Sequence, residues 1–417
     1  MFSKKQLILI SFTLAMLFHF IFYFNLYGPP IGAFNGEVIY LFPLTSTIFM
    51  LFVFFGTYWR VTLRGEKITI LFDILVGWIL VCLVRSLLQC HSFGDIREVL
   101  LSNYLGLSLF PVLFFIAGIK PEYFSAMNKT LSIYILIAAL VSMIFINYFE
   151  FQLFLLLPIF YIIITIPLRT PGGKIMVILI TISIITVSFT NRAGLIRILI
   201  SFCILGAYYI MKIVRINKKL LRALVFLVLM IPVVSLYLGM KGQSVFQIVL
   251  GEEHDNYSQL NPYADTRTFL YYEVFQDLKL NKAFLFGKGM NAGYASESFE
   301  MFNRQIVEVG FLQMLLKTGI IGCLLYFWII LSAIFKALGR SKSLFMKALG
   351  LLIAGYLLLF FIENIIAYNL LNIVVWFAIG VCHSQELREL NDKEISSLFK
   401  GASNSTPKLE KNLSVVS

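Results

Sequence analysis

The chain has 417 residues, of which 59% are hydrophobic and 13% are charged, and its formal net charge is +12. A soluble globular protein is about half apolar and about a quarter charged, so this composition excludes that class. The positive charge does not call for a nucleic-acid partner, because basic loops beside anionic lipid account for most of it.

Apolar runs of about 20 residues, long enough to cross a bilayer as helices, recur along the chain. We predict twelve of them, at residues 7–27, 37–58, 68–90, 97–119, 129–148, 150–167, 174–190, 193–211, 220–240, 307–335, 345–367 and 369–384. The expected fold class is therefore an all-α integral membrane protein. Helices one to nine occupy residues 1–240, one large loop occupies 241–306, helices ten to twelve occupy 307–384, and a polar tail occupies 385–417.

Lys and Arg gather in alternate connections, such as 212–222 and 336–347, and at both ends of the chain. Basic residues mark the cytoplasmic side of membrane helices, so we expect both termini in the cytoplasm and the 241–306 loop outside. The first helix lacks a convincing cleavage site and is expected to remain as an anchor. The five cysteines and four histidines show no metal or redox spacing, so we expect no metal and no cofactor.

The long polar stretch from Asp265 to Gly322 stands out from the otherwise hydrophobic sequence. An apolar stripe at helical spacing (Leu270, Val274 and Leu278) predicts an amphipathic helix near residues 266–280. Several basic residues outside the expected cytoplasmic loops fall at or within the outer membrane edge, where an unpaired charge costs about 3 kcal/mol or more. The eleven basic residues that are not on the cytoplasmic side are Arg85, Arg97, Arg192, Arg197, Lys241, Arg267, Lys279, Lys282, Lys288, Arg304 and Lys317. Such residues indicate a site that holds an anion.

Arg192 is expected at the turn before the helix 193–211, where free amides and a guanidinium together suit a phosphate. The alternative is that Arg192 reaches the interface or pairs with an acid such as Glu363. Arg267 is expected in the first turn of the amphipathic helix, where a cation is unfavourable unless an anion is near. Pairing with Asp265 or Glu273 is the alternative for Arg267.

Arg304 and Glu308 are four residues apart and would share one face of a helix. Glu308 is a candidate general base for a hydroxyl group, or the partner of Arg304 in a structural ion pair. His254, in the large loop, is a second candidate base. The candidate substrate-binding residues are Arg85, Arg197, Arg304, Lys317 and His254, with interface anchoring the alternative for Arg85.

Three motifs occur in order on the expected outer side. They are a Thr190-Asn191-Arg192 turn, an R-x-x-x-aromatic helix (Arg267 to Tyr271) followed by a G-x-G turn (Gly287 to Gly289), and an L-x-x-L-x-x-x-G-I-I-G segment that ends at Gly322. This set resembles the O-antigen polymerase and O-antigen ligase superfamily of bacterial membrane glycosyltransferases. The resemblance covers about residues 180–325, and the rest of the chain matches by hydropathy and topology alone.

The resemblance implies a bundle of the GT-C type in the bacterial inner membrane, with a periplasmic active site in and beside the 241–306 loop. The substrate would be an oligosaccharide on undecaprenyl pyrophosphate, whose diphosphate Arg192 and Arg267 would hold without a metal. Glu308 would complete the catalytic set. Membrane lipid and a chain-length regulator would be the other partners.

A His-Asn pair that opens the G-I-I-G helix in ligases is replaced here by Glu308 and Val309. This departure favours a polymerase over a ligase. A lipid-linked oligosaccharide flippase or another transporter is the alternative from a different class, since twelve helices with both ends inside fit it equally well. No internal repeat of the kind typical of transporters is evident between the two halves.

Overall fold

The computed structural model describes residues 2–28, 39–58, 67–145, 147–188, 192–214, 217–240, 268–296 and 301–400. These residues are mostly helical, and the two strands found among them form a single antiparallel hairpin. The helices up to residue 168 are α1 (Lys4–Tyr27), α3 (Leu41–Val53), the π-helical η1 (Phe54–Tyr58), α5 (Lys67–Leu88), α6 (Phe93–Leu101), the 3-10 helix η2 (Gly106–Phe114), α7 (Phe115–Ile119), α8 (Pro121–Ile144), α9 (Phe149–Leu155), α10 (Ile159–Ile164) and η3 (Ile166–Leu168).

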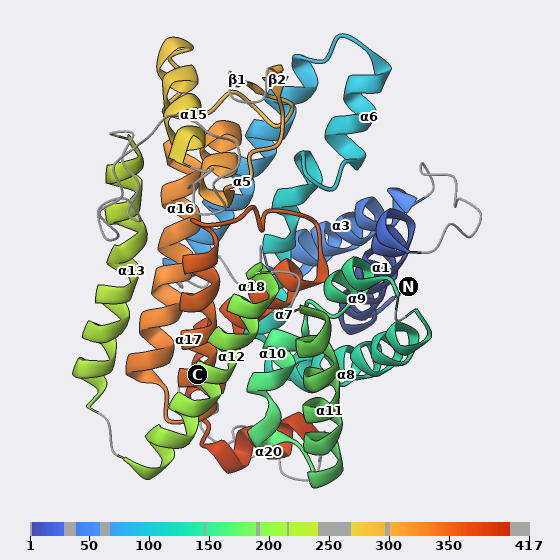
Figure 1. Cartoon of the computed structure of the whole chain (residues 1–417), viewed down its shortest axis with the longest axis vertical. Coiled ribbons are helices and arrows are strands. Elements are labelled where there is room, and N and C mark those ends of the chain that lie inside the picture. Colours follow the sequence, from blue (N-terminus) through green and yellow to red (C-terminus); the bar gives the residue numbers. More distant parts are fainter. Residues whose placement is uncertain are drawn as a thin grey trace, which may run out of the picture.

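The remaining elements complete the bundle drawn in Figure 1. They are α11 (Pro171–Ser188), α12 (Arg192–Ile213), α13 (Lys218–Met240), α15 (Thr268–Leu280), β1 (Tyr294–Ser296), β2 (Met301–Arg304), α16 (Gly310–Arg340), α17 (Leu344–Leu359), α18 (Leu370–His383), α19 (Gln385–Glu389) and α20 (Asp392–Lys400).

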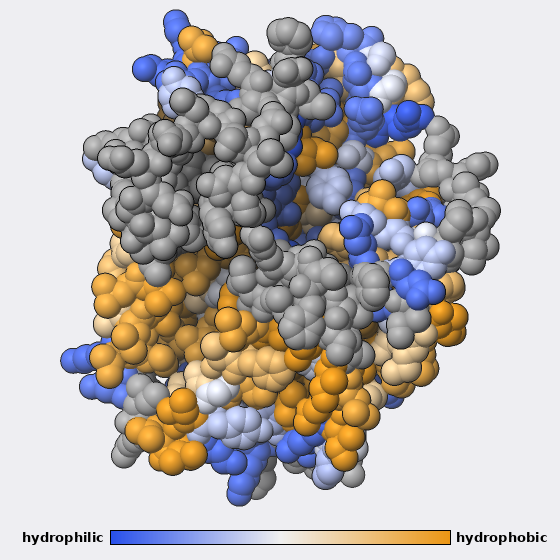
Figure 2. Space-filling model, in the orientation of Figure 1, coloured by the Kyte–Doolittle hydropathy of each residue, from blue (hydrophilic) through white to orange (hydrophobic). Residues whose placement is uncertain are grey.

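Five helical segments in the described part are long and apolar enough to cross a membrane. They are Lys4–Tyr27, Ile70–Leu88, Phe93–Ile119, Pro121–Ile144 and Gly310–Arg340, and shorter apolar helices accompany them. Many large apolar side chains are exposed, and Figure 2 shows them as a broad band between two hydrophilic ends. The chain is therefore an all-α, multi-pass membrane protein.

Two predicted helices are divided into separate short helices. The segment 97–119 consists of parts of α6, η2 and α7, because Ser102 is extended and Pro111 lies within a 3-10 turn. The segment 150–167 consists of α9, α10 and η3, and Pro158 caps α10. Proline lacks an amide donor and breaks the helical hydrogen-bond pattern, so a single spanning helix was the wrong prediction for this segment.

The two ends of the molecule differ. One end carries α15 and the β1–β2 hairpin and is uppermost in Figure 1; we call it the hairpin end. The opposite end carries the connection between α16 and α17, where the amide of Lys342 donates to the carbonyl of Arg388, 3.0 Å away. Residues 385–400 of the predicted polar tail thus fold as α19 and α20 against the bundle, and Asp392 accepts a hydrogen bond from the amide of Phe345 at 3.1 Å.

The core of the bundle lies around α16, α17 and α18. Every residue of α18 is buried, including Trp376 at 0% exposure. α7 crosses α18 where Gly118 meets Gly380, and a Cβ on either glycine would overlap the opposite backbone. Small residues at such a crossing let two membrane helices approach closely. This packing fixes α16, which positions the site described next.

Candidate functional site

The helix α16 is broken at Gly319. This residue has φ 69° and ψ −175°, and helical conformation continues on both sides of it. That region of backbone space is essentially restricted to glycine. Because a break leaves amides and carbonyls without helical partners inside an apolar bundle, other groups must satisfy them.

A loop after α15, residues 283–289, fills the break; we call it the insertion loop. The amide of Ile320 donates to the carbonyl of Phe284 at 3.0 Å. In the other direction, the amide of Lys288 donates to the carbonyl of Leu316 at 2.7 Å. Gly287 adopts φ 67°, and a Cβ there would lie 2.6 Å from the amide nitrogen of Gly319. The G-x-G turn and the G-I-I-G segment of the sequence are therefore parts of one joint.

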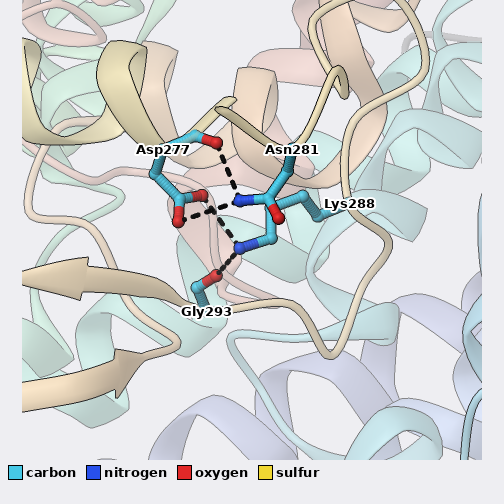
Figure 3. A network of polar contacts seen from close by, with 4 residues as sticks. All are labelled: Asp277, Asn281, Lys288 and Gly293. Atoms are coloured by element: carbon cyan, nitrogen blue, oxygen red, sulfur yellow. Dashed lines mark hydrogen bonds and ion pairs between the residues drawn. The ribbon is translucent and has the colours of Figure 1, made fainter. Parts of the chain in front are cut away.

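Lys288 ties the insertion loop to α15 and the hairpin, as Figure 3 shows. Its ammonium group donates to Asp277 Oδ2 at 2.8 Å and to the carbonyl of Gly293 at 2.7 Å. Asn281 also donates to the carbonyl of Asp277 at 2.8 Å. The side chains of Lys288 and Asp277 are only 23% and 12% exposed. Lys288 is thus a structural residue of the loop.

Arg85, near the end of α5, holds the insertion loop from the other side. Its Nη2 donates to the carbonyl of Phe286 at 2.8 Å. Its Nε is buried and has no hydrogen-bond partner among the described residues. Nearby, Ser86 Oγ accepts a hydrogen bond from the amide of Met290 at 2.5 Å. Arg85 therefore retains donor capacity that the described residues do not use.

The first amides of α16 face the segment that follows α17. The amide of Gly310 donates to the carbonyl of Glu363 at 3.1 Å. The amide of Phe311 donates to the carbonyl of Phe360 at 3.0 Å. The Glu363 carboxylate binds Arg197 of α12, with Nη2 2.5 Å and Nε 2.9 Å from the same oxygen. These two side chains are 11% and 14% exposed. Arg197 thus lies beside the start of α16, paired with an acid.

Arg304 and Glu308 form an ion pair with Nη2 and Oε1 2.7 Å apart. Their helical placement was wrong, because Arg304 ends β2 and Glu308 precedes α16. Arg304 also donates to the hydroxyl of Tyr294 at 3.2 Å. Burial raises the pKa of Tyr294, and the positive charge of Arg304 opposes that rise. Glu308 is 46% exposed, so its carboxylate is accessible.

Lys317 is completely buried in the first half of α16. Its ammonium group donates to the carbonyl of Tyr104, just before η2. The same carbonyl accepts a hydrogen bond from Gln313 Nε2 at 3.4 Å, and Gln313 Oε1 accepts one from the amide of Val307 at 2.8 Å. Sequence reasoning missed Gln313, although a lone amide in a membrane helix is itself a signal.

Five of the predicted site residues lie along the first half of α16 or on segments bonded to it. Arg85, Arg197, Arg304, Glu308 and Lys317 all contact the first half of α16 or the segments joined to it. Arg192 is the first residue of α12, about 7.5 Å along the helix axis from Arg197. The side chain of Arg192 lies outside the described part, as do Arg267 and His254 entirely.

A cluster of three or more His, Cys, Asp or Glu side chains able to hold a metal ion is not found among the described residues. The five cysteines are free thiols. Comparison with protein-family models, with curated proteins and with solved structures finds no match to the chain.

Proposed function

We propose that the chain is a polysaccharide polymerase that joins repeat units carried on undecaprenyl pyrophosphate, in the manner of O-antigen or capsular polysaccharide assembly. The observation that carries the proposal is the joint at Gly319. Two motifs of the resemblance, the G-x-G turn and the G-I-I-G segment, bind each other there through backbone hydrogen bonds. Basic side chains of three other segments, α5, α12 and β2, contact groups next to the same half of α16.

The proposal includes a topology of twelve membrane crossings. Both termini would be cytoplasmic, and the hairpin end would face the periplasm of a bacterium, with residues 241–306 as its large outer loop. The clustering of the candidate residues near the hairpin end supports a reaction on that side. The membrane helices would then hold the polyprenyl chain of the donor in the bilayer while its glycan reaches the site.

In the proposed reaction, a hydroxyl of the acceptor repeat unit attacks the anomeric carbon of the donor glycan. The bond from that carbon to the diphosphate oxygen breaks, and undecaprenyl diphosphate leaves with the bonding electrons. Arg192 and Arg267 would stabilise the charge that develops on the diphosphate, which is electrostatic catalysis. Glu308 would take the proton of the acceptor hydroxyl. Its Oε1 is bound to Arg304, and the second oxygen of the carboxylate would accept the proton.

A flippase or other transporter is the second candidate, and the break in α16 favours it, since discontinuous membrane helices are typical of transport proteins. In those proteins the open ends of the half-helices bind the cargo. Here the amides of Ile320 and Ile321 instead donate to carbonyls of the insertion loop, at 3.0 and 3.5 Å. The break is therefore filled by the chain itself, which makes a structural role the better account.

The experiment is the glycan profile of cells that lack the protein, with lipid-linked intermediates extracted separately. Surface lipid that carries a single repeat unit is the result expected for a polymerase. Long polymer that remains on undecaprenyl pyrophosphate would instead identify a ligase-type transferase. Repeat units retained on the cytoplasmic face would identify a flippase. Either of these two results would overturn the proposal.

Complementation with variants then tests the mechanism. Arg192→Ala and Arg267→Ala should each abolish polymer formation. Arg192→Lys and Arg267→Lys should each retain only part of the wild-type polymer formation, because lysine lacks the bidentate fork of the guanidinium. Arg340→Ala is the matched control, since Arg340 is exposed at the opposite end of α16. Protein level and membrane insertion are measured for every variant. Full polymer formation by both alanine variants would refute the diphosphate role.

A further inference from the structure

Two asparagine side chains near the start of α16 carry buried polar atoms that have no hydrogen-bond partner among the described residues. Asn103 is 2% exposed, and neither its Oδ1 nor its Nδ2 finds a partner within the described part of the protein. The Nδ2 of Asn364 is likewise buried without a partner, while its Oδ1 accepts from the amide of Ile366 at 3.0 Å. Buried amides are nearly always satisfied, so these unpartnered atoms indicate groups that can hydrogen-bond to a ligand or a water molecule.

These two amides belong to one neighbourhood. The amide of Tyr368 donates to the carbonyl of Asn103 at 3.1 Å, which joins the segment before η2 to the segment that follows α17. Asn364 lies in that same segment, directly after Glu363, the partner of Arg197. The residue after Asn103 is Tyr104, whose carbonyl accepts a hydrogen bond from the ammonium group of Lys317. Both asparagines are therefore adjacent in the chain to residues that contact the candidate site.

Aromatic side chains accompany the amides. Tyr104, the residue after Asn103, is partly buried, and Tyr23 of α1 is almost completely buried. The ring of Tyr23 stacks on Phe154 with centroids 4.8 Å apart. The phenol of Tyr104 therefore adds an apolar ring and a hydroxyl that donates and accepts hydrogen bonds next to Asn103 in the chain.

We propose that Asn103 and Asn364 bind a neutral, hydroxyl-rich ligand, namely a sugar residue of the lipid-linked glycan. This proposal rests on the proposed function and adds a sugar subsite to it. Asn103 has both a donor and an acceptor without partners, and a sugar hydroxyl satisfies both, because it donates and accepts. A phosphate would leave the Asn103 Oδ1 unsatisfied, and the guanidinium of Arg197, whose partner Glu363 precedes Asn364, is already bound to that carboxylate.

The test uses the full-length protein in lipid nanodiscs and a panel of free saccharides as probes: glucose, galactose, rhamnose and N-acetylglucosamine. Binding is measured by saturation-transfer NMR, and the unfolding temperature is measured for each variant. Asn103→Leu and Asn364→Leu are compared with Asn128→Leu. Asn128 is a buried amide of α8 that is fully partnered, since its Nδ2 donates to Phe124 at 2.7 Å and its Oδ1 accepts from Tyr161 at 2.9 Å.

The wild type should bind at least one saccharide, and Asn103→Leu should weaken that binding about tenfold or more, the loss of one or two hydrogen bonds. Its unfolding temperature should stay the same or rise, because leucine removes groups that had no partner. Asn128→Leu should show the reverse pattern, with a lower unfolding temperature and unchanged binding.

Two results would overturn the sugar subsite. One is that the wild type binds none of the saccharides. The other is that Asn103→Leu lowers the unfolding temperature as much as Asn128→Leu while binding persists, which would mean that the amide holds a structural water. Free-saccharide binding needs no glycosyl transfer. Binding by a protein that forms no polymer would therefore refute the proposed function and leave the subsite intact.

Discussion

Gly319→Ala perturbs the joint on which the candidate site is built. The residue has φ 69° and ψ −175°, a conformation that alanine adopts only with strain. A Cβ at this position would overlap the carbonyl oxygen of Leu285 and lie 2.5 Å from the amide nitrogen of Gly287. Both obstacles are backbone atoms of the insertion loop, so no side-chain rotation relieves them.

The expected loss of stability follows from two contributions. Forcing a non-glycine residue into this conformation costs about 1–3 kcal/mol. Displacement of the insertion loop also breaks bonds such as Ile320 N to Phe284 O, each worth about 0.5–1.5 kcal/mol. With two such bonds lost, the free energy of unfolding should fall by about 2–6 kcal/mol.

The assay is thermal or denaturant unfolding of the purified protein in detergent, with Gly77→Ala as the control. Gly77 lies within the helix α5, and a Cβ there would meet no atom within 4 Å. Alanine is about 1 kcal/mol more favourable than glycine inside a helix, so the control should be neutral or more stable. Equal stability of the two variants would refute the account of the joint.

Three further changes test the polar contacts around it. Glu363→Ala should cost about 3–5 kcal/mol in unfolding assays, because Arg197 would remain buried without its carboxylate, and replacing both residues by apolar ones should recover most of the loss. Lys288→Met should lower the unfolding free energy by about 1–3 kcal/mol, because Asp277 would keep a largely buried charge without its ammonium partner. Glu308→Gln should lower the free energy of unfolding by at most about 1 kcal/mol, since the ion pair of Arg304 with Glu308 is partly exposed. If Glu308 is the base, the same variant should lose about 10²-fold or more of its polymer formation, measured on quantitative gels.

The hydrophobic pattern of the sequence predicted most helices well. An uninterrupted apolar run bounded by basic clusters has few alternatives in a membrane, and α1, α5 and α12 follow their predicted bounds within a few residues. The pattern failed where proline or an extended residue interrupts an equally apolar run, as in 97–119 and 150–167. Hydropathy does not distinguish a continuous helix from short helices buried in protein.

The site was predicted in part. The spacing of Arg304 and Glu308 indicated their ion pair, because residues four apart lie close together in a helix. In the structure the same two residues form the pair across the link between β2 and α16. The insertion loop could not be predicted. It contacts Gly319 through backbone atoms of segments far apart in the chain, and the only trace of this contact in the sequence is the glycines that it requires. Asn103 was overlooked for a similar reason, since burial without a partner is visible only in three dimensions.

The distribution of acids within the site decides which arginines can hold a diphosphate. Arg197 and Arg304 each bind a carboxylate, so a diphosphate at either one would have to displace an acid that is already desolvated or hydrogen-bonded. Arg85 meets a carbonyl and no carboxylate within the described residues, but it also anchors the insertion loop. Arg192 begins a helix, where amides reinforce a guanidinium, and Arg267 directly precedes the first helical residue of α15. Alanine at Arg197 should therefore lower the unfolding temperature, whereas alanine at Arg192 or Arg267 should remove polymer formation and leave the unfolding temperature unchanged.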